Sequence, residues 1–258
     1  MDNSSLGDRM KEYEGRNQYY LQKRTPVCIR VDMRAGHTFT RGFARPFDEV
    51  FGNAMVRTME YCAKNIGNCV FSYCQSDEIT FILVDYERLE TDAWFDYRTD
   101  KLCSISTSMA TMAFNKFFAG EVQDYIDGID PIFITDPEIK LIDTYERARE
   151  KGAMFDARCF NIPKEEACNL VYWRQLDATR NSIQMVGQAH FSHNELQGKS
   201  CNDIQNMLHE QRGINWNDYP TRWKRGVAWT KEIGIDIQMP VLKGNDRKYV
   251  DELIFVGD

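Results

Sequence analysis

Two aspartates stand where apolar strand patterns stop. Asp32 ends the run PVCIRVD, and Asp77 lies in the polar break QSDE between two further apolar runs. In a unit of strand, helix, strand and strand, the first and second strands can be sheet neighbours, which would bring the two carboxylates close together. Carboxylates held so close repel each other unless a cation lies between them. The pair therefore indicates a site for hard divalent cations such as Mg²⁺, which bind oxygen ligands and promote phosphoryl transfer.

The same residues are also common in ordinary turns. An aspartate after a strand often forms a turn or a cap, and Ser-Asp-Glu is a frequent composition between the strands of a hairpin. Spacing alone therefore leaves both a metal site and a simple turn open.

The elements that must hold the two aspartates follow from the spacing of apolar residues. Helical spacing predicts helices over residues 1–23, from the N-cap residue Asp48 to Gly67, and over 97–118. Turn signals and β-branched residues predict strands over residues 27–32, on both sides of the break in 69–85, and over 153–162. The order strand, helix, strand, strand, helix, strand predicts an α+β fold with a ferredoxin-like β-α-β-β-α-β core.

The region after Pro163 has a different pattern. It is mainly helical, and strand signals return only in RGVAWTKE, residues 225–232. We therefore expect a sheet-based catalytic domain over residues 1–150 and a mainly helical C-terminal region over 151–258, packed on that core.

Composition limits the possible classes of function. The 258 residues carry a net charge of −7, which argues against indiscriminate nucleic-acid binding, so contact with RNA needs a local basic patch. No apolar run approaches the ~18 residues that suggest a membrane span, and the N-terminal segment lacks the apolar core of a signal peptide. Eight cysteines without a C-x-x-C pair favour reduced thiols in a cytoplasmic protein.

Four blocks resemble the tRNA-His guanylyltransferase family, in its bacterial and archaeal branch of guanylyltransferase-like 3′-to-5′ polymerases. They are RVDMRAGHTFTRGFARPFD, YCQSDEITFIL, RTDKLCSISTSMATMAF and WRQLDATRNSIQMVGQAHFSHNELQGKS, in the order found in the family. The resemblance covers nearly the whole chain. It implies a polymerase-like palm that adds nucleotides to the 5′ end of tRNA or tRNA-like RNA, after ATP has activated a 5′-monophosphate end.

The resemblance also implies roles for single residues. Asp32 and Asp77 would be the catalytic carboxylates and would bind two Mg²⁺ ions together with the backbone carbonyl of Met33. Glu78 would support the site. The substrate nucleotide, which is GTP, another NTP or ATP, would contact Asp32, Met33, Arg34, Ala35, Gly36, His37, Arg45, Ser76, Asp77, Arg98 and Lys101. Members of the family are commonly tetramers, so a homotetramer is expected.

Two positions in the first block depart from the pattern that the family usually shows. Met33 stands where the family has Gly, and Gly36 stands where it has Phe. The Met33 carbonyl stays available to a metal only if the backbone there does not need a positive φ, which would strain a Met. Loss of the Phe removes bulk near the base or sugar, which Met33 could partly refill. The pocket is then either reshaped for a different nucleotide or less active.

Basic and aromatic residues alternate in HEQRGINWNDYPTRWKRG, residues 209–226. This mixture suits contact with phosphates and stacking on bases, and a solvated surface loop is an equal alternative. The segment TRNSIQM, residues 179–185, replaces the eukaryotic HINNLYN and implies templated repair of shortened 5′ ends rather than strict addition of one G. The residues expected to contact RNA are Arg180, Asn181, Lys199, Arg222, Lys224 and Arg225.

Two other functions remain open from the sequence. The same palm could make a different nucleotidyl product without RNA. Alternatively, the chain could be a nucleotide- or RNA-binding homologue in which the changes at Met33 and Gly36 reduce catalysis.

Overall fold

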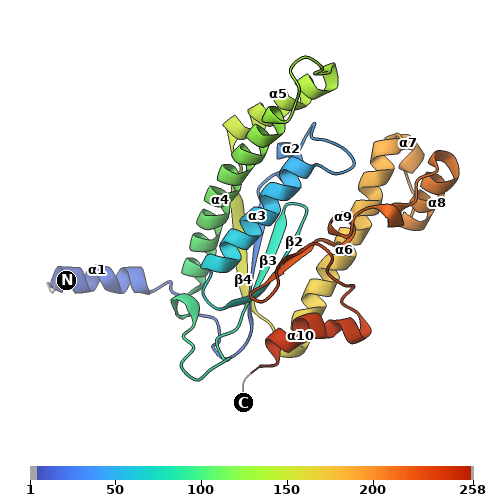
Figure 1. The fold of residues 1–258 in the computed structure, drawn as a ribbon. Helices are drawn as coiled ribbons and strands as arrows, with labels where there is room; N and C mark the ends of the chain where they lie inside the picture. The colour runs from blue at the N-terminus through green and yellow to red at the C-terminus, as the bar shows by residue number, and fades with distance from the viewer. Residues whose placement is uncertain (1–4, 257–258) are drawn as a thin grey trace.

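A six-stranded antiparallel sheet organises the chain in the computed structural model, which describes residues 5–256 (Figure 1). The sheet has the order β4-β1-β3-β2-β5-β6. Its strands are β1 (Val27–Met33), β2 (Cys69–Gln75), β3 (Glu78–Leu83), β4 (Phe155–Asn161), β5 (Val227–Thr230) and β6 (Gly234–Asp236). The first four strands and their helices have the predicted order β-α-β-β-α-β, so the α+β prediction is confirmed.

Helices cover both faces of this sheet (Figure 1): α3 and α4 pack on one face, and α6 and α10 pack on the other. The α-helices of the described residues are α1 (Ser5–Gly15), α2 (Gly36–Phe39), α3 (Glu49–Asn65), α4 (Thr99–Asp127), α5 (Asp136–Lys151), α6 (Lys164–His190), α7 (His193–Leu196), α8 (Cys201–Arg212), α9 (Thr221–Arg225) and α10 (Lys248–Ile254). Asp48 caps α3 as predicted, since its side chain accepts a hydrogen bond from the Phe51 N–H. No helix within residues 5–256 is long and apolar enough to cross a membrane.

The predicted helix over residues 1–23 is shorter in the structure. Residues 1–4 lie outside the described part of the chain, and α1 ends at Gly15. The following backbone leaves the helix because it pairs with the segment before α4: the Leu21 N–H bonds to Tyr97 O, and the Thr99 N–H bonds to Tyr19 O. None of the residues in α1 is buried, and the helix projects from the rest of the molecule (Figure 1).

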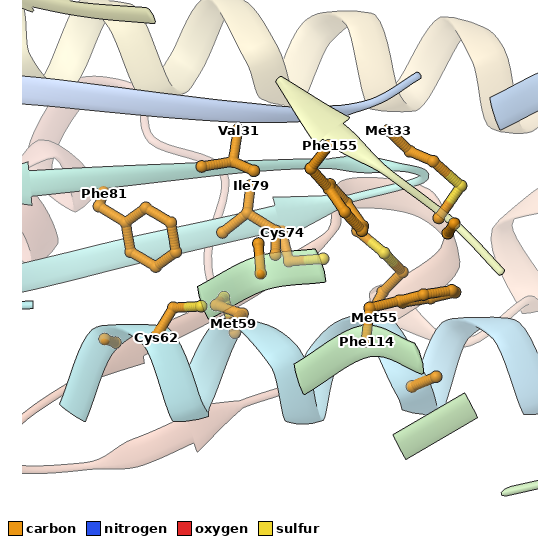
Figure 2. Close-up of a cluster of buried hydrophobic side chains, with 14 of the residues drawn as sticks. Val31, Met33, Met55, Met59, Cys62, Cys74, Ile79, Phe81, Phe114 and Phe155 are labelled. Carbon is orange, nitrogen blue, oxygen red and sulfur yellow. The ribbon is translucent and has the colours of Figure 1, made fainter. Parts of the chain in front are cut away.

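Successive side chains of β1 point to opposite faces of the sheet, and each face packs on a different hydrophobic core. Val27, Ile29, Val31 and Met33 enter the larger core between the sheet and the helices α3 and α4. Part of this core is shown in Figure 2, where Met33 lies near Met55 and Phe155. The opposite face of the sheet packs on α6 and α10, with Cys28 among the buried residues. Arg30 and Asp32 are on this second face, so β1 carries polar residues into the space beside α6.

The sheet takes strands from both sides of residue 150. β4 pairs with β1 along its whole length, and β5 pairs with β2. Helix α6 packs on the same sheet through Cys168 and Val171. The division of the chain into residues 1–150 and 151–258 stays a prediction.

Candidate active site

The two aspartates lie side by side, although by a different route from the one expected. β3, not β2, is the neighbour of β1. Asp32 is paired with Glu78 at the start of β3, and Asp77 precedes Glu78 in the turn between β2 and β3. The Met33 N–H donates to Asp77 O at 3.0 Å. The two acidic positions are therefore fixed to each other by backbone hydrogen bonding.

Negative charges crowd around Asp32. Burial raises the pKa of its carboxyl group above the ordinary value, and the charges of Asp77 and then Asp156 raise it further, while Arg158 and Arg30 lower it. Asp156 is the residue of β4 directly opposite Asp32, which makes this a pair of like charges across two strands. A site with such repulsion gains stability when a cation binds. The oxygen donors present suit Mg²⁺, which retains water and phosphate oxygens as further ligands.

The backbone at Met33 does not have the positive φ that would strain a Met in place of the family's Gly. Met33 is an ordinary strand residue, and the left-handed conformation falls on Ala35, with φ of 55°. The Met33 side chain is only 2% exposed and belongs to the core shown in Figure 2. It therefore leaves the carbonyl free of strain but does not fill volume next to a nucleotide.

Gly36 makes room for Asp77. A Cβ atom at position 36 would lie 1.9 Å from Asp77 Oδ2 and 2.8 Å from Asp77 Cγ, so any side chain there would displace the carboxylate. Gly36 is buried at the start of α2, directly after the left-handed Ala35. The departure from Phe is thus tied to the position of the Asp77 carboxylate.

A cavity of about 520 Å³ opens beside the turn that carries Asp77. This volume lies in the range of small-molecule sites. The expected site residues that line it are Gly36, His37, Arg45, Ser76, Asp77, Asn181 and Arg222. The walls come from the segment around α2, from α3, from the end of β2, and from α6 and α9. Another hollow, between α5 and the segment before α3, contains none of the expected residues.

Arg98 and Lys101 lie at the other end of the sheet. The carbonyl of Thr99 is 3.8 Å from Cys159 Sγ, whereas the Phe155 N–H bonds to Thr111 Oγ1 at 3.2 Å. The Asp32 end of the sheet is therefore level with Thr111, roughly 18 Å along α4 from Thr99 at 1.5 Å per residue. The structure does not bring these two basic residues to the aspartates.

The expected RNA contacts are dispersed. Arg180 is exposed and pairs with Asp177, and Lys199 is exposed after α7. Lys224 is buried: its amine donates to the Asn217 carbonyl and lies over the Trp216 ring, and burial lowers its pKa. Arg225 is half-buried. Arg34 is exposed next to Asp32, and its N–H bonds to Met154 O.

A buried ionic network that the sequence did not reveal supports the turn with Asp77. Arg174 of α6 donates from Nε to Glu78 Oε1 at 2.7 Å and from Nη2 to Asp177 Oδ2 at 3.1 Å. Arg30 Nε stands 3.6 Å from Glu78 Oε2. Burial raises the pKa of Glu78, although Arg174 and Arg30 oppose the shift. Glu78 therefore joins α6 to the strand that starts beside Asp77.

The chain is similar to known proteins in sequence and in fold. The model of the family described as tRNAHis guanylyltransferase matches residues 7–163. The chain belongs to the tRNAHis guanylyltransferase family. The predicted family and the predicted enzyme class, nucleotidyltransferase, are confirmed.

Individual members of the family are similar over most of their length. A bacterial tRNA(His) guanylyltransferase (Thg1)-like protein in complex with ATP has a TM-score of 0.83 and 37% identity, covering 98% of this chain and 100% of that one. The complex of such a protein with GTP has a TM-score of 0.77 and 34% identity over the same shares. The tRNA(His) guanylyltransferase of Saccharomyces cerevisiae is 27% identical over 225 residues, covering 80% of this chain and 82% of that protein.

Proposed function

We propose that this member of the tRNAHis guanylyltransferase family adds nucleotides to the 5′ end of tRNA or tRNA-like RNA. The 3′-hydroxyl of an NTP attacks the α-phosphorus of a 5′-triphosphate end, a new P–O bond forms, and pyrophosphate leaves. A 5′-monophosphate end first attacks the α-phosphorus of ATP, releasing pyrophosphate, and the AMP of the adenylylated end leaves in the second step. Nucleotide complexes of bacterial relatives support NTP as the substrate class.

The observation that carries this proposal is the placement of Asp32 and Asp77 beside a nucleotide-sized cavity. Asp77 lines the cavity together with Ser76, His37 and Arg45, which offer a hydroxyl, an imidazole and a guanidinium to a triphosphate. Asp32 does not line the cavity, but it is paired with Glu78, the residue that follows Asp77. We therefore place the reacting phosphorus between the carboxylates of Asp32 and Asp77.

Asp32, Asp77 and the Met33 carbonyl would hold two Mg²⁺ ions. When bound, these ions lower the pKa of the attacking hydroxyl and stabilise the charge on the leaving pyrophosphate. The chain's own contribution is to hold the two carboxylates together, through the hydrogen bond from Met33 to Asp77 and the space left by Gly36.

The RNA that fits best is one with a shortened 5′ end. The cavity is lined by Asn181 of TRNSIQM, the segment that implied templated repair. Strict addition of one G to tRNA-His is the narrower alternative. The cytoplasmic location and the homotetramer stay predictions, and sedimentation of the purified protein would test the second.

A primer-extension assay tests the proposed function. The substrate is a stem-loop RNA with a recessed 5′-triphosphate end, supplied with Mg²⁺ and the four NTPs. Wild type is expected to fill the recess. Asp77→Asn is expected to reduce the rate of extension at least ~100-fold, because the substitution removes a charged group from the active site. Asp143→Asn, at an exposed position on α5, is the matched control and should keep full activity.

Two other outcomes would favour the two alternative functions left open by the sequence. If wild type turns over NTP without RNA and leaves the 5′ end unchanged, the palm makes a different nucleotidyl product. If calorimetry finds NTP binding without any turnover, the chain is a binding homologue. Either result contradicts the proposal.

A further inference from the structure

An exposed tryptophan stands next to the candidate active site and has no role in the core or the cavity. Trp173 of α6 is 53% exposed. The guanidinium of Arg174 lies 4.6 Å from the centre of its ring, and that of Arg30 lies 6.0 Å away. Arg30 is two residues before Asp32 on the same face of β1, about 7 Å along the strand. The ring therefore lies over the same face of the sheet that carries Asp32, beside the residue two positions before it.

The surface around Trp173 continues along two elements. Leu176, one turn later on α6, is 50% exposed. Arg158 of β4 is paired with Arg30 across the strands, and its side chain is 53% exposed and lies 3.5 Å from Asp156. We name Trp173, Leu176 and Arg158 the stacking platform. It offers an aromatic face, an apolar flank and an exposed guanidinium.

The residues of the stacking platform are not part of the wall of the nucleotide cavity. Asp77 lines the cavity, whereas Asp32, Trp173 and Arg158 do not. The proposed reaction needs two substrates at one site, because the phosphorus of the RNA 5′ end must meet the 3′-hydroxyl of the NTP. With the NTP in the cavity, the open surface beside Asp32 is the place left for the end of the RNA.

We infer that the 5′-terminal base of the RNA stacks on Trp173, with Arg158 contacting its backbone phosphate. This inference rests on the proposed function, since it assigns a position to the RNA of that reaction. Tryptophan beside arginine suits a nucleic-acid end, because every base offers a face for stacking and every nucleotide a phosphate. Three of the nearby acidic groups already have cationic partners: Glu78 and Asp177 are paired with Arg174, and Asp156 is paired with Arg158. Asp32 is the carboxylate to which the proposed function assigns Mg²⁺.

The test measures binding of RNA and NTP separately in Trp173→Leu, Trp173→Phe and Phe255→Leu. Phe255 has the same exposed fraction as Trp173, 53%, and lies after α10, so it is the matched control. The probe is the same stem-loop RNA with a 5′-triphosphate, labelled at its 3′ end. Its Kd is measured by fluorescence anisotropy, and the KM values for RNA and NTP are measured in the extension assay.

Trp173→Leu is expected to raise the Kd and KM for RNA roughly tenfold, because loss of one base-stacking contact has an effect of that order. The KM for NTP should stay the same, and Trp173→Phe should recover most of the RNA affinity. Phe255→Leu should match wild type.

Three results would overturn the inference. One is an unchanged Kd and KM for RNA in Trp173→Leu while wild type extends the RNA. The second is an equal loss of NTP affinity, which would place Trp173 at the nucleotide. The third is a change in oligomeric state with unchanged RNA affinity, which would make the surface a contact between copies of the chain. If wild type extends no RNA, the proposed function fails, and the anisotropy comparison still decides whether Trp173 binds an RNA end.

Discussion

At the scale of single residues, the two departures in the first sequence block have separate explanations. Met33 is a core residue of β1 whose backbone is unstrained, so the carbonyl that we propose as a metal ligand does not require Gly. Gly36 has the opposite role, because it leaves the volume that the Asp77 carboxylate occupies. A Phe at position 36, the usual residue of the family, would need Asp77 to lie elsewhere.

Gly36→Ala is expected to reduce extension activity by roughly 10- to 100-fold, since displacement of a catalytic group by about 1 Å has effects of this size. The fold should be kept, because Gly36 does not have a positive φ that an Ala would strain. Steady-state extension kinetics and a thermal melt measure the two properties. Gly120→Ala, at a position in α4 with nothing within 4 Å of the added Cβ, is the control. Equal activity of the two variants would contradict the role assigned to Gly36.

Asp32→Asn is expected to make the protein more stable and inactive. The pKa of Asp32 is raised in the folded protein, so the folded state binds this proton more tightly than the unfolded chain does. Stability is therefore lost as pH rises from the ordinary value of 3.8 through the folded pKa. At pH 7 without divalent ions, Asn should raise the free energy of unfolding by about 0.5–2 kcal/mol.

The gain should vanish below the ordinary pKa of the carboxyl group, where Asp32 is protonated in both states. Mg²⁺ should raise the melting temperature of wild type and have little effect on Asp32→Asn, because a ligand stabilises only the state that binds it. Urea unfolding at several pH values with and without Mg²⁺ measures this. An Asn variant that is less stable at pH 7 would refute the repulsion described for this site.

At the scale of elements, periodicity in the sequence predicted the order of strands and helices but not all of their partners. β1 and β3 are adjacent, and the sequence favoured β1 and β2, because strand order in a sheet depends on helix packing far along the chain. Arg98 and Lys101 match basic positions of the family's blocks, yet they lie at the start of α4, about 12 residues before the part of the helix that is level with Asp32. Arg174 and Glu78 are 96 residues apart, and no local pattern marks two charges that meet only after folding.

Arg174→Met tests the attachment of α6 to the sheet. It should lower the free energy of unfolding by about 3 kcal/mol, since it leaves the buried Glu78 carboxylate without its main partner. The loss should be smaller at low pH, because the pKa of Glu78 is already raised by burial and protonation removes the buried charge. The penalty therefore grows as pH rises above 4.5, the ordinary value.

Two further variants complete that test. Glu78→Gln combined with Arg174→Met should recover much of the lost stability, because no unpaired charge is then buried. Arg180→Met removes an exposed partner of Asp177 on the same helix and should change stability by less than about 0.5 kcal/mol. Urea titrations followed by circular dichroism measure all three. If Arg174→Met and Arg180→Met are equally stable, the network has no anchoring role.

At the scale of the whole molecule, the two proposed substrates meet across one sheet. The NTP cavity is walled by parts of the chain from α2 to α9, and the stacking platform combines β4 with α6. Neither site is complete within residues 1–150. A catalytic unit built this way needs the sheet, α6 and the returning strand β5 to be folded together.

The full chain should therefore unfold in a single cooperative transition rather than in two. β4 pairs with β1, β5 pairs with β2, and α6 and α10 cover apolar residues of the sheet such as Phe71 and Ile82. Loss of the C-terminal region would expose that face, so neither part is expected to remain folded without the other. Trp fluorescence reports mainly on the C-terminal region, since Trp173, Trp216, Trp223 and Trp229 lie there, whereas far-ultraviolet circular dichroism reports on all helices. Coincident urea midpoints are expected, and a fluorescence transition at lower urea than the dichroism transition would favour two domains divided near residue 150.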